Sequence, residues 1–106
     1  MAKYLIAASY TTDGAKGVLK DGGTKRRQAA EQLIKSAGGK LEGFYFAFGE
    51  TDAYVIVDAP DAATVAAVSL AINATGAVNT KTIVLLSPEE IDQAAKKNVT
   101  YRAPGQ

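Results

Sequence analysis

Apolar and polar positions recur along this chain with two different periods, which predicts a mixed α+β domain. An alternation with a period of two predicts four strands, over Lys3–Tyr10, Lys40–Phe48, Ala53–Ala59 and Val78–Leu86. A spacing of three to four residues predicts two helices. The first helix follows Thr24 as N-cap and runs to about Ala37, and the second follows Asp61 and ends before Gly76.

The order of these elements is strand, helix, two strands, helix, strand, which predicts a ferredoxin-like βαββαβ fold. We expect a four-stranded antiparallel sheet with two helices on one face. Residues 11–23 contain four glycines and are expected to form a long irregular connection. Ser87 and Glu90 form a capping box, so a short C-terminal helix should run to about Lys97. Residues 1–97 are thus expected to form a single domain, and residues 98–106 a loose tail.

The predicted sheet is apolar on both faces. In the first strand Tyr4, Ile6 and Ala8 alternate with Leu5 and Ala7. The two helices can cover only one face, and an open apolar sheet of this size is rare on a monomer. We therefore expect the uncovered face to pack against a second copy of the chain, as a homodimer or higher homo-oligomer.

Composition limits the chemistry that the chain can perform. The net charge is +1, from 12 basic and 11 acidic residues, so we expect no nucleic-acid partner. Cysteine and histidine are absent, which excludes disulfides, thiolate nucleophiles, Cys/His zinc sites and imidazole catalysis, and we expect no cofactor. The uncharged stretch Ala62–Thr80 is rich in alanine and interrupted by polar residues, so we expect no membrane span. The N-terminus lacks the pattern of a signal peptide, and a cytoplasmic location is expected.

The run Gly43–Asp52 (GFYFAFGETD), followed by Val55–Asp61, resembles the GYD domain family. Further similar positions lie between Lys3 and Leu86: Tyr10-Thr11, Gly14, Leu19–Asp21, Arg27, Gly38–Leu41, Gly76–Val78, Thr80 and Thr82. The resemblance implies a dimeric α/β-barrel, in which two ferredoxin-like sheets face one another, and it implies no particular activity. The sequence departs from the family pattern at four positions: Thr51 for the tyrosine of the Gly-Tyr-Asp signature, Asp58 for a common glutamate, and Asn79 and Lys81 for an arginine and a glutamate.

Tyrosines and acids on the strands are the first group of candidate ligand-binding residues. Tyr10 ends the first strand, where its phenol can bind a ligand, act as an acid or base, or simply pack at the rim of the sheet. Tyr45 and Tyr54 can stack on a planar ligand or pack in an interface. Asp52 follows a turn and can bond to nearby backbone. Asp58 lies among apolar strand residues, where it needs a partner or a raised pKa, or it lies at a solvated strand end.

Basic and hydroxyl side chains form the second group. Lys20, Arg26 and Arg27 flank the glycine-rich connection, where they can hold a small organic acid or form a solvated helix face. Thr80 and Thr82 share one face of the last strand, where their hydroxyls can bind a ligand or bond to neighbouring strands.

Two functions are consistent with these residues. The first is a homo-oligomeric small-molecule-binding protein or cofactor-free enzyme, with a pocket between the sheet and the partner copy; proton transfer on a small organic acid is its feasible chemistry. We expect that pocket to be lined by Tyr10, Tyr45, Asp58, Thr80 and Thr82. The alternative is a non-enzymatic scaffold protein that assembles with itself and docks a partner.

Overall fold

The computed structural model describes residues 2–106, which form four strands and four helices. The strands are β1 (Ala2–Tyr10), β2 (Lys40–Phe46), β3 (Ala53–Ala59) and β4 (Val78–Leu85). The helices are α1 (Thr12–Asp21), α2 (Gly23–Ser36), α3 (Ala62–Asn73) and α4 (Pro88–Ala95). Each predicted strand is present, although β2 ends two residues and β4 one residue earlier than the sequence pattern predicts.

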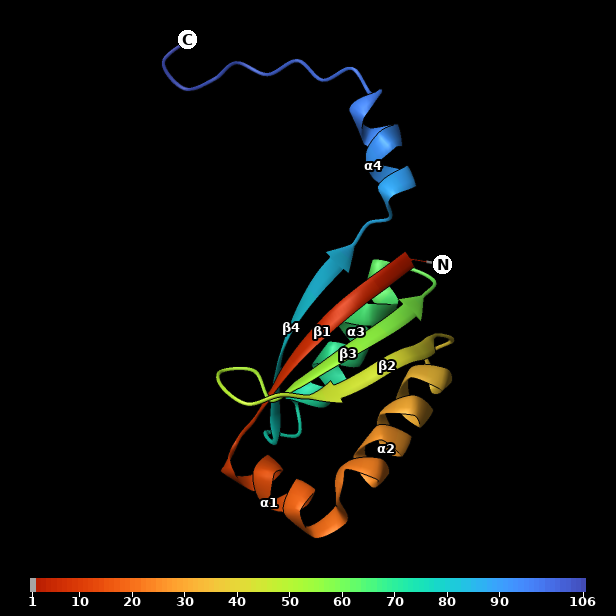
Figure 1. Ribbon diagram of the computed structural model, residues 1–106, viewed down its shortest axis with the longest axis vertical. Helices are drawn as coiled ribbons and strands as arrows, with labels where there is room; N and C mark the ends of the chain where they lie inside the picture. Colours follow the sequence, from red (N-terminus) through yellow and green to blue (C-terminus); the bar gives the residue numbers. More distant parts are fainter. Residues whose placement is uncertain (1) are drawn as a thin grey trace.

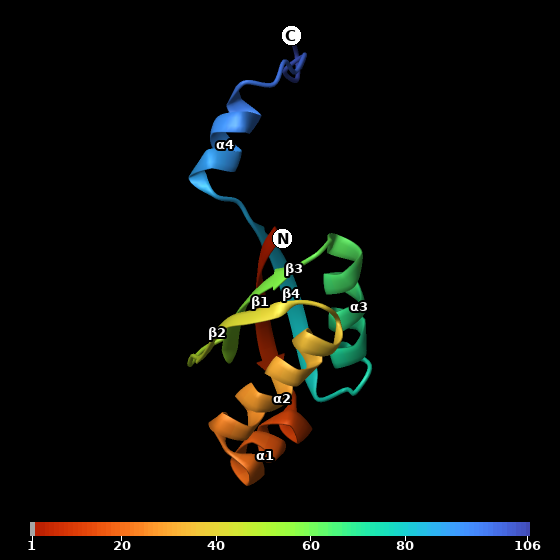
Figure 2. The same ribbon diagram turned by 90° about the vertical axis from the view of Figure 1, so that its right-hand side faces the viewer.

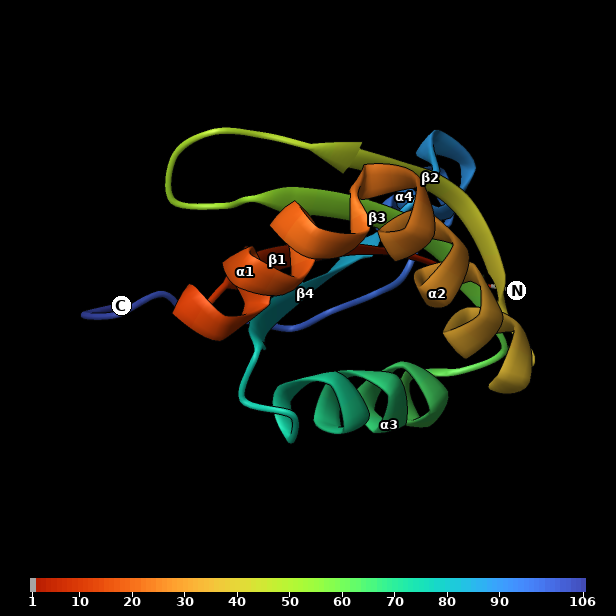
Figure 3. The same ribbon diagram turned by 90° about the horizontal axis from the view of Figure 1, so that it is seen from below.

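The strands form one antiparallel sheet in the order β2-β3-β1-β4, so the predicted ferredoxin-like topology is confirmed. Helices α2 and α3 cover one face of this sheet (Figures 1 and 2). The register is regular between β1 and both of its neighbours, whereas the pairing of β2 with β3 shifts between Leu41 and Gly43. The opposite face of the sheet, which we call the open face, carries no helix along its length; helix α4, which appears behind β2 in Figure 3, lies beyond the end of the sheet (Figure 1).

The core lies between the sheet and these two helices. Tyr4 and Ile6 of β1 and Val55 and Val57 of β3 are buried there, against residues of both helices. The helical contribution comes from the predicted stripes: Ile34 of α2, and Val65 and Val68 of α3. Helix α3 begins as predicted, since the Asp61 carboxylate accepts hydrogen bonds from the backbone N–H and the hydroxyl of Thr64.

The expectation of an irregular connection over residues 11–23 was wrong, because most of it forms helix α1. The Thr11 hydroxyl caps this helix by accepting from the backbone N–H of Gly14 at 3.3 Å. Asp13 in the first turn and Lys20 in the last turn suit the helix dipole. Only Gly22 at its end needs a positive φ, of 83°, and there the chain turns from α1 into α2.

The capping box that begins α4 is confirmed, with Ser87 and Glu90 bonding reciprocally. The helix ends at Ala95, two residues before the predicted end. It projects beyond the sheet together with the chain that follows (Figures 1 and 2). No helix in residues 2–106 is at once long and apolar enough to cross a bilayer.

Candidate functional site

A cavity of about 470 Å³ lies on the helical side of the sheet, among β1, β3, β4 and helices α1, α2 and α3. Its walls are mostly apolar. Ile6 and Val55 line it from the sheet, Leu33 from α2 and Ile72 from α3. Cavities of this volume with apolar walls and few polar groups are typical of small-molecule sites.

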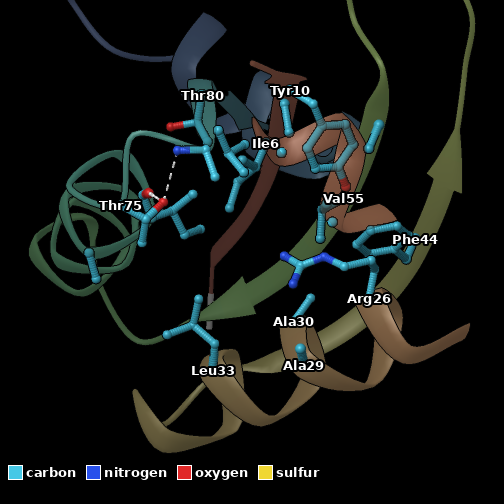
Figure 4. A pocket seen from close by; sticks show the side chains of 18 of the residues that line it. Ile6, Tyr10, Arg26, Ala29, Ala30, Leu33, Phe44, Val55, Thr75 and Thr80 are labelled. Atoms are coloured by element: carbon cyan, nitrogen blue, oxygen red, sulfur yellow. Dashed lines mark hydrogen bonds between the residues drawn. The ribbon is translucent and has the colours of Figure 1, made fainter. Parts of the chain in front are cut away.

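Arg26 is the basic group of this cavity. It is half-buried, and its guanidinium points into the cavity, in the same space as Tyr10 and Phe44 (Figure 4). Its place follows from helical spacing, because Ala30 and Leu33 lie four and seven residues further along α2 on the apolar stripe. The ion pairs formed within residues 2–106 all involve Lys3, so no carboxylate lies within ion-pairing distance of Arg26.

One contact to the backbone of Tyr10 and one to its ring hold this residue in place. Its backbone N–H donates to the Asp52 carboxylate at 2.8 Å, and its ring stacks on Phe46 with a centroid distance of 6.5 Å. The backbone N–H of Asp52 donates in turn to the carbonyl of Ala8 at 2.9 Å. The carboxylate of Asp52 therefore bonds to backbone at the end of β1 rather than in its own turn, and it holds the strand end that carries the phenol.

The hydroxyls of Thr80 and Thr82 bond to helix α3 rather than to neighbouring strands. Asn73 donates from its amide to the Thr80 hydroxyl at 3.1 Å and accepts from the Thr80 backbone N–H at 3.0 Å. Ser69 and Thr82 share a hydrogen bond of 3.2 Å. These contacts explain Ser69 and Asn73 of the uncharged helix, and of the two threonines only Thr80 also lines the cavity.

Gly14 brings helix α1 close to the loop before β4 and so completes one wall of the cavity. A Cβ atom at this position would lie 2.0 Å from the carbonyl oxygen of Ala77. Thr11 fixes the same approach, since its backbone N–H donates to Ala77 O at 3.0 Å and its hydroxyl to Gly76 O at 3.0 Å. The glycine thus serves close packing inside a helix, not a positive φ.

On the open face, Asp58 has a charged partner, which is one of the alternatives that the sequence left open. The Lys3 ammonium lies 3.5 Å from its carboxylate and 2.6 Å from that of Glu42. A hydrogen bond with Glu42 and the charge of Lys3 hold the pKa of Asp58 below its usual value, against the opposing effect of partial burial. The pKa of Lys3 is raised, chiefly by its hydrogen bond to Glu42. Partnering, and not a raised pKa, therefore accommodates Asp58.

The sheet separates the predicted candidates into two groups. Tyr10 and Thr80 line the cavity on the helical side, whereas Asp58 and the cross-strand pair of Tyr45 and Tyr54 lie on the open face. The five residues expected in one pocket are thus not brought together, because alternate strand residues point to opposite faces. Lys20 and Arg27 are exposed and do not line the cavity.

The sequence interpretation missed Asp13, Phe44 and Thr75 as cavity residues. The alternation along the strand predicted the face on which Phe44 lies. It did not predict that Phe44 lies beside Arg26. Asp13 was missed because the connection that carries it was not recognised as a helix. The capping sequence Thr11 to Gly14 was the available signal.

Groups of three or more acidic side chains that could hold a metal ion are absent from residues 2–106. Sheet order, helix placement and cavity together define a ferredoxin-like α+β domain with a cavity between its two layers. The GYD domain family model matches residues 4–95, so the chain belongs to the GYD domain family. Neither the comparison with curated proteins nor that with solved structures gives a match.

Proposed function

We propose that this GYD domain protein is a homo-oligomeric small-molecule-binding protein or cofactor-free enzyme, whose ligand occupies the cavity between the sheet and helices α1 to α3. The cavity of about 470 Å³ is the observation that carries this proposal. It is on the helical side of the sheet, and it replaces the expected pocket between the sheet and a partner copy.

The ligand class that best fits the cavity is an apolar organic acid. Apolar walls favour a hydrocarbon body, and the unpaired guanidinium of Arg26 offers two parallel N–H donors to a carboxylate or sulfonate. The Tyr10 phenol adds a donor and acceptor within the same cavity (Figure 4). Tyr10 and Asp13 are the groups available there for proton transfer, the reaction that such a site supports without metal or histidine.

The self-association is supported by the open face. Leu5, Ile56 and Ile83 lie on it with Tyr45 and Tyr54, and no helix covers them. Tyr45 is 65% exposed. Burial of such a face against a second copy removes an apolar surface that monomers rarely present. Light scattering at micromolar concentration should give twice the chain mass or more.

Two matched dyes test the ligand class: 8-anilinonaphthalene-1-sulfonate and its uncharged analogue N-phenyl-1-naphthylamine. Arg26→Gln should weaken binding of the sulfonate about tenfold, since one charge-assisted contact is lost, and should leave the uncharged dye unchanged. Arg27→Gln is the control, because Arg27 is exposed beside Arg26 and outside the cavity. Ala30→Leu, which fills the cavity from α2, should weaken both dyes.

The scaffold function is the second candidate, and the open face together with the projecting C-terminus favours it. The dyes separate the two candidates. If Ala30→Leu and Arg26→Gln leave both affinities unchanged, while the chain is oligomeric, the cavity has no binding role and the scaffold interpretation stands.

A further inference from the structure

The segment Leu86–Gln106, which we call the C-terminal arm, lies outside the folded body of its own chain. Every residue from Pro88 to Gln106 is exposed. Only Leu86 and Ser87 separate β4 from α4, so the arm continues past the end of the sheet instead of turning back over it (Figures 1 and 2).

The arm has the sequence of a segment that packs on a surface. Helix α4 has eight residues, shorter than the roughly 12–15 at which isolated helices become even marginally stable in water. Its Ile91 is 51% exposed. Beyond the helix, Val99 and Tyr101 alternate with polar residues in the manner of a half-buried strand, yet they are 81% and 76% exposed. Each of these apolar side chains lacks a surface to cover it.

The size of the molecule measures how much surface is left uncovered. The accessible surface is 7584 Å², whereas a compact monomer of 11.0 kDa has about 5,600 Å². The radius of gyration is 16.8 Å, against about 13 Å for a compact domain of this length. The excess is about 2,000 Å² per chain, so two chains carry about 4,000 Å², within the range that obligate homodimers bury.

We propose that the arm of each chain crosses to a second copy and packs Ile91, Val99 and Tyr101 against the rim of that copy's open face. A copy stacked on the open face lies beside the arm, because the arm leaves the sheet from β4, one edge of that face. Reciprocal exchange by a two-fold axis then covers both arms and both sheets. This inference rests on the homodimer of the proposed function and is independent of the ligand.

Cross-linking tests the exchange directly, because the chain contains no cysteine. Chains carrying Tyr101→Cys are refolded together with chains carrying Ile83→Cys on the open face, and a short bis-maleimide is added. We expect a covalent dimer that contains one chain of each kind. The control pairs Tyr101→Cys with Lys16→Cys, which is exposed on α1, and should give no such product. With both cysteines in one chain, a link within that chain would overturn the proposal.

Substitutions in the intact chain give a second measurement. Ile91→Asp combined with Tyr101→Asp should raise the dimer dissociation constant at least about tenfold in sedimentation velocity, since two apolar anchors are lost. Gln93→Asp adds a similar charge on the opposite face of α4 and should leave the dimer unchanged. Circular dichroism checks the fold, which these exposed residues do not support.

The outcomes separate this inference from the ligand proposal. An unchanged dissociation constant in the double variant, or a wild-type chain that is monomeric at micromolar concentration, overturns the arm exchange. If Arg26→Gln and Ala30→Leu leave the dye affinities unchanged, the ligand proposal is overturned, whereas the arm exchange is unaffected.

Discussion

Replacement of Gly14 by alanine tests how helix α1 closes the cavity. The added Cβ would meet the carbonyl oxygen of Ala77 at 2.0 Å and the ring of Tyr10 at 3.1 Å. The first contact is with backbone that Thr11 holds by hydrogen bonds, so no side-chain rotation relieves it. Either α1 or the loop before β4 has to move by about an ångström.

The expected change in stability combines two losses and one gain. Overpacking costs about 1–3 kcal/mol, and a contact as short as 2.0 Å to backbone belongs at the upper end. Alanine in a helix interior returns about 1 kcal/mol relative to glycine. Displacement of Ala77 also weakens the hydrogen bond from Thr11, worth about 1 kcal/mol. We expect a net destabilisation of about 1–3 kcal/mol, a fall in Tm of about 5–15 °C.

Gly17→Ala is the matched control in the same helix. A Cβ at position 17 has no atom within 4 Å, so only the helix preference remains, and stability should rise by about 0.5–1 kcal/mol. Urea unfolding and thermal melts of both variants, at one protein concentration because of self-association, measure the difference. If Gly14→Ala is as stable as Gly17→Ala, close packing of α1 on the loop before β4 is wrong.

Two further predictions concern the acids. Asp52→Ala removes the acceptor of the Tyr10 N–H and should cost about 1–3 kcal/mol in urea unfolding, whereas Asp52→Asn, which retains an acceptor, should cost less; equal losses would contradict this. Lys3→Gln should raise the pKa of Asp58 in a carboxyl-carbon NMR titration. Since that pKa is depressed in the folded state, the stability contributed by Asp58 is present above the usual carboxylate pKa and is lost as pH falls through the folded pKa. The loss of stability at acid pH should therefore be smaller in Lys3→Gln. An unchanged Asp58 titration would exclude a contribution of Lys3 to the pKa of Asp58.

The strands and the two layer-forming helices could be predicted because their signals are local. Alternation assigned Tyr4, Ile6 and Ala8 to one face of the first strand, and the caps at Asp61 and Ser87 began helices where expected. The cap predicted at Thr24 was wrong, because α2 begins at Gly23, directly after the turn at Gly22. The GYD resemblance of the central block was likewise present in the residues themselves. Helix α1 escaped prediction because Gly14 and Gly17 have low helix preference, and tertiary packing against Ala77 overrides it.

The candidate site likewise depends in part on local sequence and in part on contacts between residues far apart in the chain. The sequence by itself determined which residues have useful chemistry, but it left Arg26 between holding a small organic acid and forming part of a solvated helix face. Only the tertiary structure decided that Arg26 and Tyr10 share one cavity while Asp58 faces the other side of the sheet. The physical reason is that a cavity depends on how far α1, α2 and α3 stand from the sheet and from one another. That spacing is set by contacts between residues far apart in the chain, which no local pattern records.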